Sequence, residues 1–306
     1  MKLFISLFLL FSTTLNSENK KLIVVLGMHR SGSSIMTKSL ELLGAELGDH
    51  LLPPQLDNPL GFFEDIEIGM FNETALYLHG LASHSIKFFP SKLINEEKLI
   101  EYGKRLLLKK LEGKKNFCFK DPRTARNFPL WRKVIDELPN TDPYVIVIVR
   151  NPLSVAQSLY DRNGLDPIRS YYMWLLYYFS ALYHSRGLPI HIIHYEELLL
   201  NPQTILQKVS RFAGLQMGEV DAFIDSRYQH HSYTQQELKE EAHVPIQVVE
   251  LYETLRKEEK IFPKLSKIEN FLSQIDPLLE LTDREMHIGE SREHRGFPLI
   301  EELIKR

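Results

Sequence analysis

The chain has 306 residues, of which 43% are hydrophobic, so it can bury the core of one large domain or two ordinary domains. Its 37 Lys and Arg residues nearly balance its 40 Asp and Glu residues, which excludes the broad basic surface of proteins that track nucleic acid. Any anion must therefore be bound by a local group of residues. The single cysteine, Cys118, excludes an internal disulfide, so nothing here requires an oxidising compartment.

Residues 1–17 form an apolar segment with one lysine near its start and small polar residues at its end. The apolar run of about 13 residues is shorter than the roughly 20 that span a bilayer. A cleaved secretory signal, a short membrane-associating segment and a misassigned start codon all fit this pattern. We divide the chain into a hydrophobic, signal-like leader at 1–19, a main domain at 20–234 and a C-terminal helical extension at 235–306.

Four short apolar stretches are predicted to be strands, because continuous apolar runs are typical of strands buried on both faces. They are KLIVVLG at 21–27, NFCFK at 116–120, YVIVIV at 144–149 and PIHIIHY at 189–195. Helical patterns lie between them, and no further strand follows residue 235. Strands that alternate with helices indicate a parallel sheet with helices on both faces. We therefore expect a three-layer α/β fold with a central parallel sheet of about four to five strands.

The stretch LGMHRSGSS at 26–34 follows the first predicted strand and opens a helix. The spacing of its two glycines and of Ser34 fits the phosphate-binding pattern G-x-x-x-x-G-K-[ST], but Ser33 stands where the lysine would be. Glycines let the backbone approach an anion, and the start of a helix supplies free N–H groups. A tight turn with a surface arginine is the alternative. The residues predicted to wrap a phosphate or sulfate are Arg30, Ser31, Gly32, Ser33 and Ser34.

The third predicted strand ends in Arg150, where a metal-dependent nucleotide hydrolase or kinase would place an Asp for Mg²⁺. A site with an extra cation and no obvious metal ligand suits a second anionic group on the ligand. Ser158 lies two helical turns beyond Asn151 and can add a hydroxyl on the same face. We therefore expect Arg150 and Ser158 to bind a second anion, and we expect no metal. An arginine that caps the edge of the sheet is the alternative.

The two motifs, R-S-G-[ST]-[ST] after the first strand and R-N-P-x-x-x-x-x-S after a later one, together resemble those of the sulfotransferase superfamily. Other stretches, between about residues 22 and 215, are similar to its bacterial and carbohydrate-type branch; they are LLGAELGDHLLPP, DNPLGFFED, FKDPRT and HYEELLLNPQTILQKVSRFAGL. The resemblance implies a P-loop-like fold and the sulfuryl donor 3′-phosphoadenylyl sulfate (PAPS). It places the 5′-phosphosulfate at Arg30 and its loop, and the 3′-phosphate at Arg150 and Ser158.

Sulfuryl transfer to a hydroxyl or amine needs a base for the acceptor's proton and a cation for the charge on the departing phosphate. Candidate bases after the first helix are Asp57, Glu64, Asp65 and Glu67. Glu64 is favoured because two aromatic residues precede it and can shield it from water, which raises the pKa of a carboxyl. Asp57 stands in a sequence typical of a turn. A solvated loop glutamate is the alternative interpretation of Glu64.

Lys120, at the end of the second predicted strand, is the expected cation and matches the family's strand-end lysine by position. Cytosolic small-molecule sulfotransferases carry a histidine just after this lysine, and Pro122 stands there in this chain, which favours Glu64 as the base. Asp121 and Arg123 fit a structural ion pair around a turn at least as well as a catalytic role. Tyr195 matches a position that packs near the nucleotide in some relatives.

The sequence therefore predicts a PAPS-dependent sulfotransferase that acts on a hydroxyl or, less favourably, an amine. The acceptor, whether glycan, peptide or small molecule, stays open. A P-loop kinase of a small metabolite and a nucleotide-binding module without turnover are the alternatives. The supply of PAPS and the single cysteine favour a cytoplasmic location, whereas the segment at 1–17 also fits a secretory or membrane-associated protein.

Overall fold

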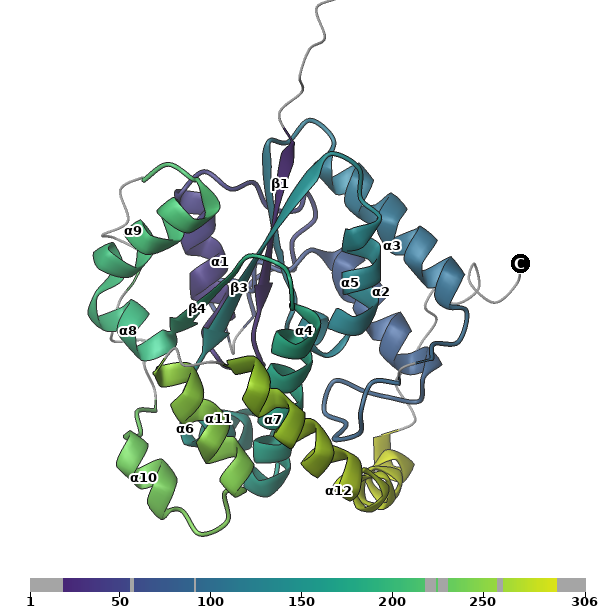
Figure 1. Ribbon diagram of the computed structural model, residues 1–306, viewed down its shortest axis with the longest axis vertical. Helices are drawn as coiled ribbons and strands as arrows, with labels where there is room; N and C mark the ends of the chain where they lie inside the picture. The colour runs from purple at the N-terminus through teal and green to yellow at the C-terminus, as the bar shows by residue number, and fades with distance from the viewer. Residues whose placement is uncertain are drawn as a thin grey trace, which may run out of the picture.

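The computed structural model describes most of the chain between residues 19 and 290 (Figure 1). The described ranges are 19–55, 58–90, 92–217, 224, 231–257 and 261–290, with side chains of the last range as far as 275. Residues 1–18 of the predicted leader and the candidate base Asp57 lie outside these residues. Within them, no helix combines the length and the apolar character needed to cross a membrane.

A four-stranded parallel sheet forms the centre of the described structure, with strand order β2-β1-β3-β4. The strands are β1 (Lys20–Leu26), β2 (Asn116–Lys120), β3 (Thr141–Val149) and β4 (Ile190–His194). In the register of the sheet, Val24 of β1 lies between Phe119 of β2 and Val145 of β3. The predicted parallel sheet and all four predicted strands are confirmed, although β3 begins earlier than its apolar run.

Helices cover both faces of the sheet, as Figure 1 shows. One face is covered by α1 (Ser33–Leu42), α8 (Tyr195–Leu200) and α9 (Pro202–Ala213). The other face packs against α2 (Ile66–Leu78), α3 (Glu96–Leu111), α4 (Pro122–Arg126), α5 (Phe128–Asp136), α6 (Pro152–Asn163) and α7 (Pro167–His184). Successive side chains of a strand point to opposite faces, so Val25 packs in the core with α1 whereas Val24 packs in the core with α7. The three-layer α/β prediction is confirmed.

Three helices follow α9 in the described chain: α10 (Gln235–Glu240), α11 (Ile246–Arg256) and α12 (Ile261–Glu290). Helices α11 and α12 pack against α7, at the bottom of Figure 1. Leu251, Leu255, Leu265 and Leu272 are fully buried in the core that also contains α7. Because burying a leucine contributes about 1.5–3 kcal/mol, these helices are firmly joined to the main core.

The four strands run in the same direction, so their carboxyl ends meet at one edge of the sheet, where α/β proteins bind ligands. Strand β1 leads into the loop at 27–32, and β2 ends at Lys120. Arg150 follows β3 directly, and Tyr195 follows β4. The topology thus brings the predicted phosphate loop, the predicted cation and Arg150 to the same place.

Candidate active site

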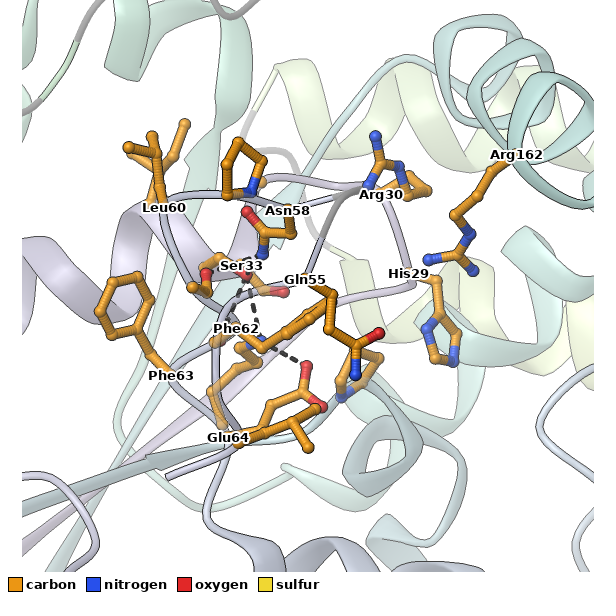
Figure 2. Close-up of a pocket in the computed structure, with 18 of the residues that line it drawn as sticks. His29, Arg30, Ser33, Gln55, Asn58, Leu60, Phe62, Phe63, Glu64 and Arg162 are labelled. Atoms are coloured by element: carbon orange, nitrogen blue, oxygen red, sulfur yellow. Dashed lines mark hydrogen bonds and ion pairs between the residues drawn. The ribbon is translucent and has the colours of Figure 1, made fainter. Parts of the chain in front are cut away.

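A cavity of about 650 Å³ lies at the carboxyl edge of the sheet (Figure 2). Its walls come from the loop after β1, the ends of β2, β3 and β4, residues of the segments 52–55 and 58–64 that follow α1, and Arg162 of α6. Seven of the nine predicted site residues line it: Arg30, Gly32, Ser33, Ser34, Glu64, Lys120 and Arg150. The other two, Ser31 and Ser158, lie behind this wall, where they are buried.

The loop after β1 turns sharply into α1 through two residues in the left-handed region, Arg30 with φ 66° and Gly32 with φ 88°. A Cβ atom on Gly32 would lie 2.2 Å from Cδ2 of Tyr195, so only glycine lets the loop pack against that ring. Ser31 is buried, and both its amide and its hydroxyl donate to the carbonyl of Met28, at 3.2 and 2.6 Å. Ser31 therefore shapes the turn rather than facing the cavity.

The N-terminus of α1 faces the cavity through Ser33 and Ser34. The N-cap residue of this helix is Gly32, which supplies no side-chain hydrogen bond to its first amides. The first amides of an uncapped helix retain hydrogen-bonding capacity and carry a partial positive charge. The site therefore offers an anion both N–H groups and a favourable helix dipole.

Arg30 and Ser158 meet at the side of the cavity, where Arg30 Nε donates to Ser158 Oγ at 2.8 Å. Arg150 lies beside them and donates from Nη1 to the Arg30 carbonyl at 2.9 Å and from Nη2 to the His231 carbonyl at 2.8 Å. Its guanidinium also lies over the ring of Tyr195, 4.7 Å from the centroid. The sequence analysis assigned Arg30 to one anion and Arg150 with Ser158 to another. The structure brings these three residues into contact.

One donor atom of Arg150 is not used in a hydrogen bond within the described structure. Its Nε atom is buried and has no partner among the described residues. Burial lowers the pKa of Arg150, but a guanidinium remains charged at physiological pH. A buried charged donor without an acceptor is costly, so this atom marks a place where an anionic ligand would be favourable.

Glu64 and Lys120 form a buried ion pair at the floor of the cavity, with 2.6 Å between Oε1 and Nζ. The side chain of Lys120 is 1% exposed and that of Glu64 is 12% exposed. Lys120 Nζ also donates to Ser34 Oγ at 3.3 Å, which links the pair to the start of α1. Burial raises the pKa of Glu64 above its ordinary value, although the charge of Lys120 opposes this shift.

The other described candidate bases do not line the cavity. Asp65 caps α2 by accepting from the amides of Glu67 and Ile68, at 3.0 and 3.2 Å. It also pairs with Lys110 at 2.7 Å, and both side chains are 1% exposed. Glu67 pairs with Lys110 and with Lys109 on the neighbouring helix. Among the described candidates, Glu64 alone faces the site.

Asp121 and Arg123 form the ion pair that the sequence left open as the alternative to catalysis. The Asp121 carboxylate accepts from the Arg123 amide at 2.8 Å and from its Nε at 2.9 Å, and so caps α4. Burial alone would raise the pKa of Asp121, but the guanidinium of Arg123 holds it below its ordinary value. Arg123 also reaches Glu73 at 3.2 Å. Asp121 therefore anchors the turn after Lys120.

The cavity residues that sequence reasoning did not single out include His29, Gln55 and Arg162. Burial, with the charges of Arg162 and Arg123, lowers the pKa of His29 to about 3, so its ring is neutral at physiological pH. The helical spacing offers a signal for Arg162, which lies four residues after Ser158 and therefore on the same face of α6. Gln55 carries no comparable pattern.

No group of three or more His, Cys, Asp or Glu side chains suited to a metal ion occurs in the described part of the chain.

No protein-family model and no curated protein matches the chain. Solved structures similar to it include the sulfotransferase domain of the Synechococcus PCC 7002 olefin synthase, at 16% identity and a TM-score of 0.48, covering 79% of this chain and 96% of that one. The sulfotransferase domain of the curacin biosynthetic pathway is 16% identical, with a TM-score of 0.38 and coverage of 84% and 99%. A sulfotransferase from Alicyclobacillus acidocaldarius is 13% identical, with a TM-score of 0.39 and coverage of 82% and 95%. These similarities are too distant to assign an activity, which must come from the site itself.

Proposed function

We propose that this protein is a sulfotransferase that moves the sulfuryl group of PAPS to a hydroxyl or, less favourably, an amine by in-line displacement. The observation that carries the proposal is the contact of Lys120 with two groups: Glu64 at 2.6 Å and Ser34 at 3.3 Å. A buried carboxylate, a buried ammonium and the start of an uncapped helix thus meet at one point of the cavity. These are the base, the cation and the anion site that sulfuryl transfer requires.

The residues present fit a donor with two anionic groups. The amides at the start of α1 and the side chain of Arg30 would hold the 5′-phosphosulfate. Arg150 and Ser158 would hold the 3′-phosphate, and the unpartnered Nε of Arg150 supports this assignment. Rearrangement of the hydrogen bond between Arg30 and Ser158 would release both side chains toward the ligand.

The proposed sulfuryl transfer uses both members of the ion pair between Glu64 and Lys120. The acceptor oxygen attacks sulfur while the bond from sulfur to the bridging phosphate oxygen breaks, and that oxygen keeps the electron pair. Glu64 would take the acceptor's proton, a role that its raised pKa favours. Lys120 would turn from Glu64 to the departing oxygen and neutralise its developing charge.

The two alternatives fit the site less well. A P-loop kinase would need the loop lysine that Ser33 replaces and a carboxylate where Arg150 follows β3. A binding module without turnover would have no use for a buried carboxylate and ammonium at the floor of the cavity.

The first experiment is calorimetric titration of the protein with 3′,5′-ADP and with ATP, each with and without Mg²⁺. Binding of 3′,5′-ADP without Mg²⁺ supports the proposal, whereas binding of ATP alone and only with Mg²⁺ supports a kinase.

A further inference from the structure

A second cavity, of about 390 Å³, lies against α6 on the side away from the candidate active site. Leu153, Ala156 and Gln157 line it, and their spacing of three and four residues places them on one face of the helix. Ser158 and Arg162, which belong to the candidate active site, lie on the opposite face because 3.6 residues make one turn. Helix α6 therefore separates the two cavities.

The start of α7 and the segment at 233–243, which contains α10, complete the walls of the second cavity. Helices α6 and α10 both lie at the lower left of Figure 1. Much of the lining is apolar: Leu153, Ala156, Pro167, Ile168 and the rings of Tyr171 and Tyr233. A mostly apolar cavity of this size with a few polar groups is typical of sites that bind small organic molecules.

The charge of this cavity is negative, in contrast to that of the candidate active site. Its described lining residues include no Lys or Arg, and they include the carboxylates of Asp166 and Glu241. Asp166 Oδ1 accepts from the Arg169 amide at 2.9 Å, and Glu241 Oε1 contacts the His243 ring at 3.1 Å. The second oxygen of each carboxylate makes no hydrogen bond within the described part of the chain. The cavity thus favours a cation over an anion.

Tyr171 supplies an unused hydrogen-bonding group in this cavity. The residue is 5% exposed, and its hydroxyl has no hydrogen-bond partner among the described residues. Burial, with the charges of Glu241, Tyr233 and Asp166, raises the pKa of Tyr171 to about 12. These three groups line the same cavity, so the hydroxyl faces it and stays protonated at physiological pH. A buried hydroxyl without a partner is costly, so a ligand that bonds to it is favoured.

An organic ammonium ion matches the apolar lining, the negative charge and the free hydroxyl. Its N–H groups donate to carboxylate and phenol oxygens, and a hydrogen bond between an ammonium and a carboxylate is strengthened by both charges. An ammonium group also lies favourably over the face of a tyrosine ring. The apolar body of such an ion would cover the apolar lining, which a bare metal ion or a polyol would leave in contact with water.

We propose that this second cavity binds an organic ammonium ion, namely a protonated amine that carries an aromatic ring or an alkyl chain, and that Tyr171, Asp166 and Glu241 bind its charged group. The site goes beyond the proposed sulfotransferase function and does not depend on it.

The test compares tryptamine with tryptophol, which carries a hydroxyl in place of the ammonium group. Calorimetry at pH 7 measures the affinity of the full chain for each compound. We expect tryptamine to bind roughly fivefold or more tightly, because an ion pair and a cation–π contact each contribute up to about 1 kcal/mol, or a factor of about five.

Two variants locate the bound ammonium group. Tyr171→Phe removes only the hydroxyl and Glu241→Gln removes only the charge, so each is expected to weaken tryptamine binding by roughly threefold or more. Tyr171→Phe is expected to fold as the wild-type protein does, since its hydroxyl has no partner to lose, and urea unfolding checks this. The matched control is Glu250→Gln, which changes an exposed carboxylate of α11 that does not line the cavity.

Equal affinities for tryptamine and tryptophol, or no binding of tryptamine, overturn this inference. Tryptamine affinity that is unchanged in both Tyr171→Phe and Glu241→Gln overturns it as well. Displacement of tryptamine by saturating 3′,5′-ADP also overturns it, because the amine would then occupy the candidate active site. Failure of the protein to bind 3′,5′-ADP contradicts the proposed function instead and leaves the second site standing.

Discussion

Arg30 and Ser158 are 128 residues apart in the chain, yet Arg30 Nε donates a hydrogen bond of 2.8 Å to Ser158 Oγ. This bond joins the loop after β1 to helix α6, and Arg150 closes the group by donating to the Arg30 carbonyl. Two motifs that are separate in the sequence, and that we predict to bind anions, thus meet at one side of the cavity. The proposed ligand with two anionic groups a short distance apart would suit this arrangement.

The first prediction concerns the second anionic group. If Arg150 and Ser158 bind a 3′-phosphate, 3′,5′-ADP will bind at least roughly tenfold more tightly than 5′-AMP, since charge-assisted hydrogen bonds contribute about 1.5–3 kcal/mol. Calorimetry measures both affinities. Arg150→Ala is expected to abolish the preference, and Arg150→Lys to restore only part of it, because lysine keeps the charge but not the planar fork. Equal affinities in the wild-type protein would remove the 3′-phosphate assignment.

The second prediction concerns the base. Glu64→Gln keeps the size of the side chain but removes its basicity, so turnover is expected to fall by roughly 10²–10⁴ while 3′,5′-ADP still binds. The matched control is Glu46→Gln, an exposed carboxylate that does not line the cavity. A near-normal rate in Glu64→Gln would show that Glu64 is only a loop carboxylate, and Asp57 would be tested next.

The pH profile gives a third prediction. A base must be deprotonated to act, so the rate of the wild-type protein rises with pH through the pKa of Glu64, which burial places above its ordinary value of 4.5. Lys120 lowers the pKa of Glu64, so in Lys120→Ala the rise in rate is expected to occur at higher pH. The maximum rate of this variant is also expected to be lower. Steady-state rates between pH 4 and 9 measure both effects. A rise at unchanged pH in Lys120→Ala would mean that the ion pair does not control the base.

The fourth prediction concerns the buried pair of Asp65 and Lys110, which holds the segment next to Glu64 against α3. Lys110→Met leaves the buried Asp65 carboxylate without this partner, and breaking such a pair costs about 3–5 kcal/mol of unfolding free energy. Lys109→Met removes an exposed lysine, 66% accessible, that pairs with Glu67 at 3.1 Å, and is expected to cost less than about 1 kcal/mol. Urea unfolding compares the two variants. Equal losses of stability would contradict the account of Asp65 as a buried structural anchor.

The sequence predicted the sheet because its four strands are short, apolar and separated by helical patterns, and it singled out Lys120 and Arg150 because each stands at the end of a predicted strand. The parallel topology of the structure then brings these two strand ends to the same edge of the sheet. The position of His29 beside Arg162 could not be predicted, because it depends on how α6 packs against the loop after β1. The sequence likewise does not distinguish Lys110 from other helix lysines, because its contact with Asp65 depends on how α3 packs. The proposed roles of the site residues stay predictions.

Sulfuryl transfer itself tests the central claim most directly. The measurement uses ³⁵S-labelled PAPS, an extract of the source cell as the supply of acceptors, and excess EDTA, with labelled products identified by mass spectrometry. Because Ser33 and Arg150 stand where a Mg²⁺-dependent enzyme would place its lysine and its carboxylate, the account predicts that label moves to an acceptor despite the chelator and that Glu64→Gln suppresses this transfer. Label that stays on PAPS, together with Mg²⁺-dependent transfer of phosphate from ATP, would contradict it.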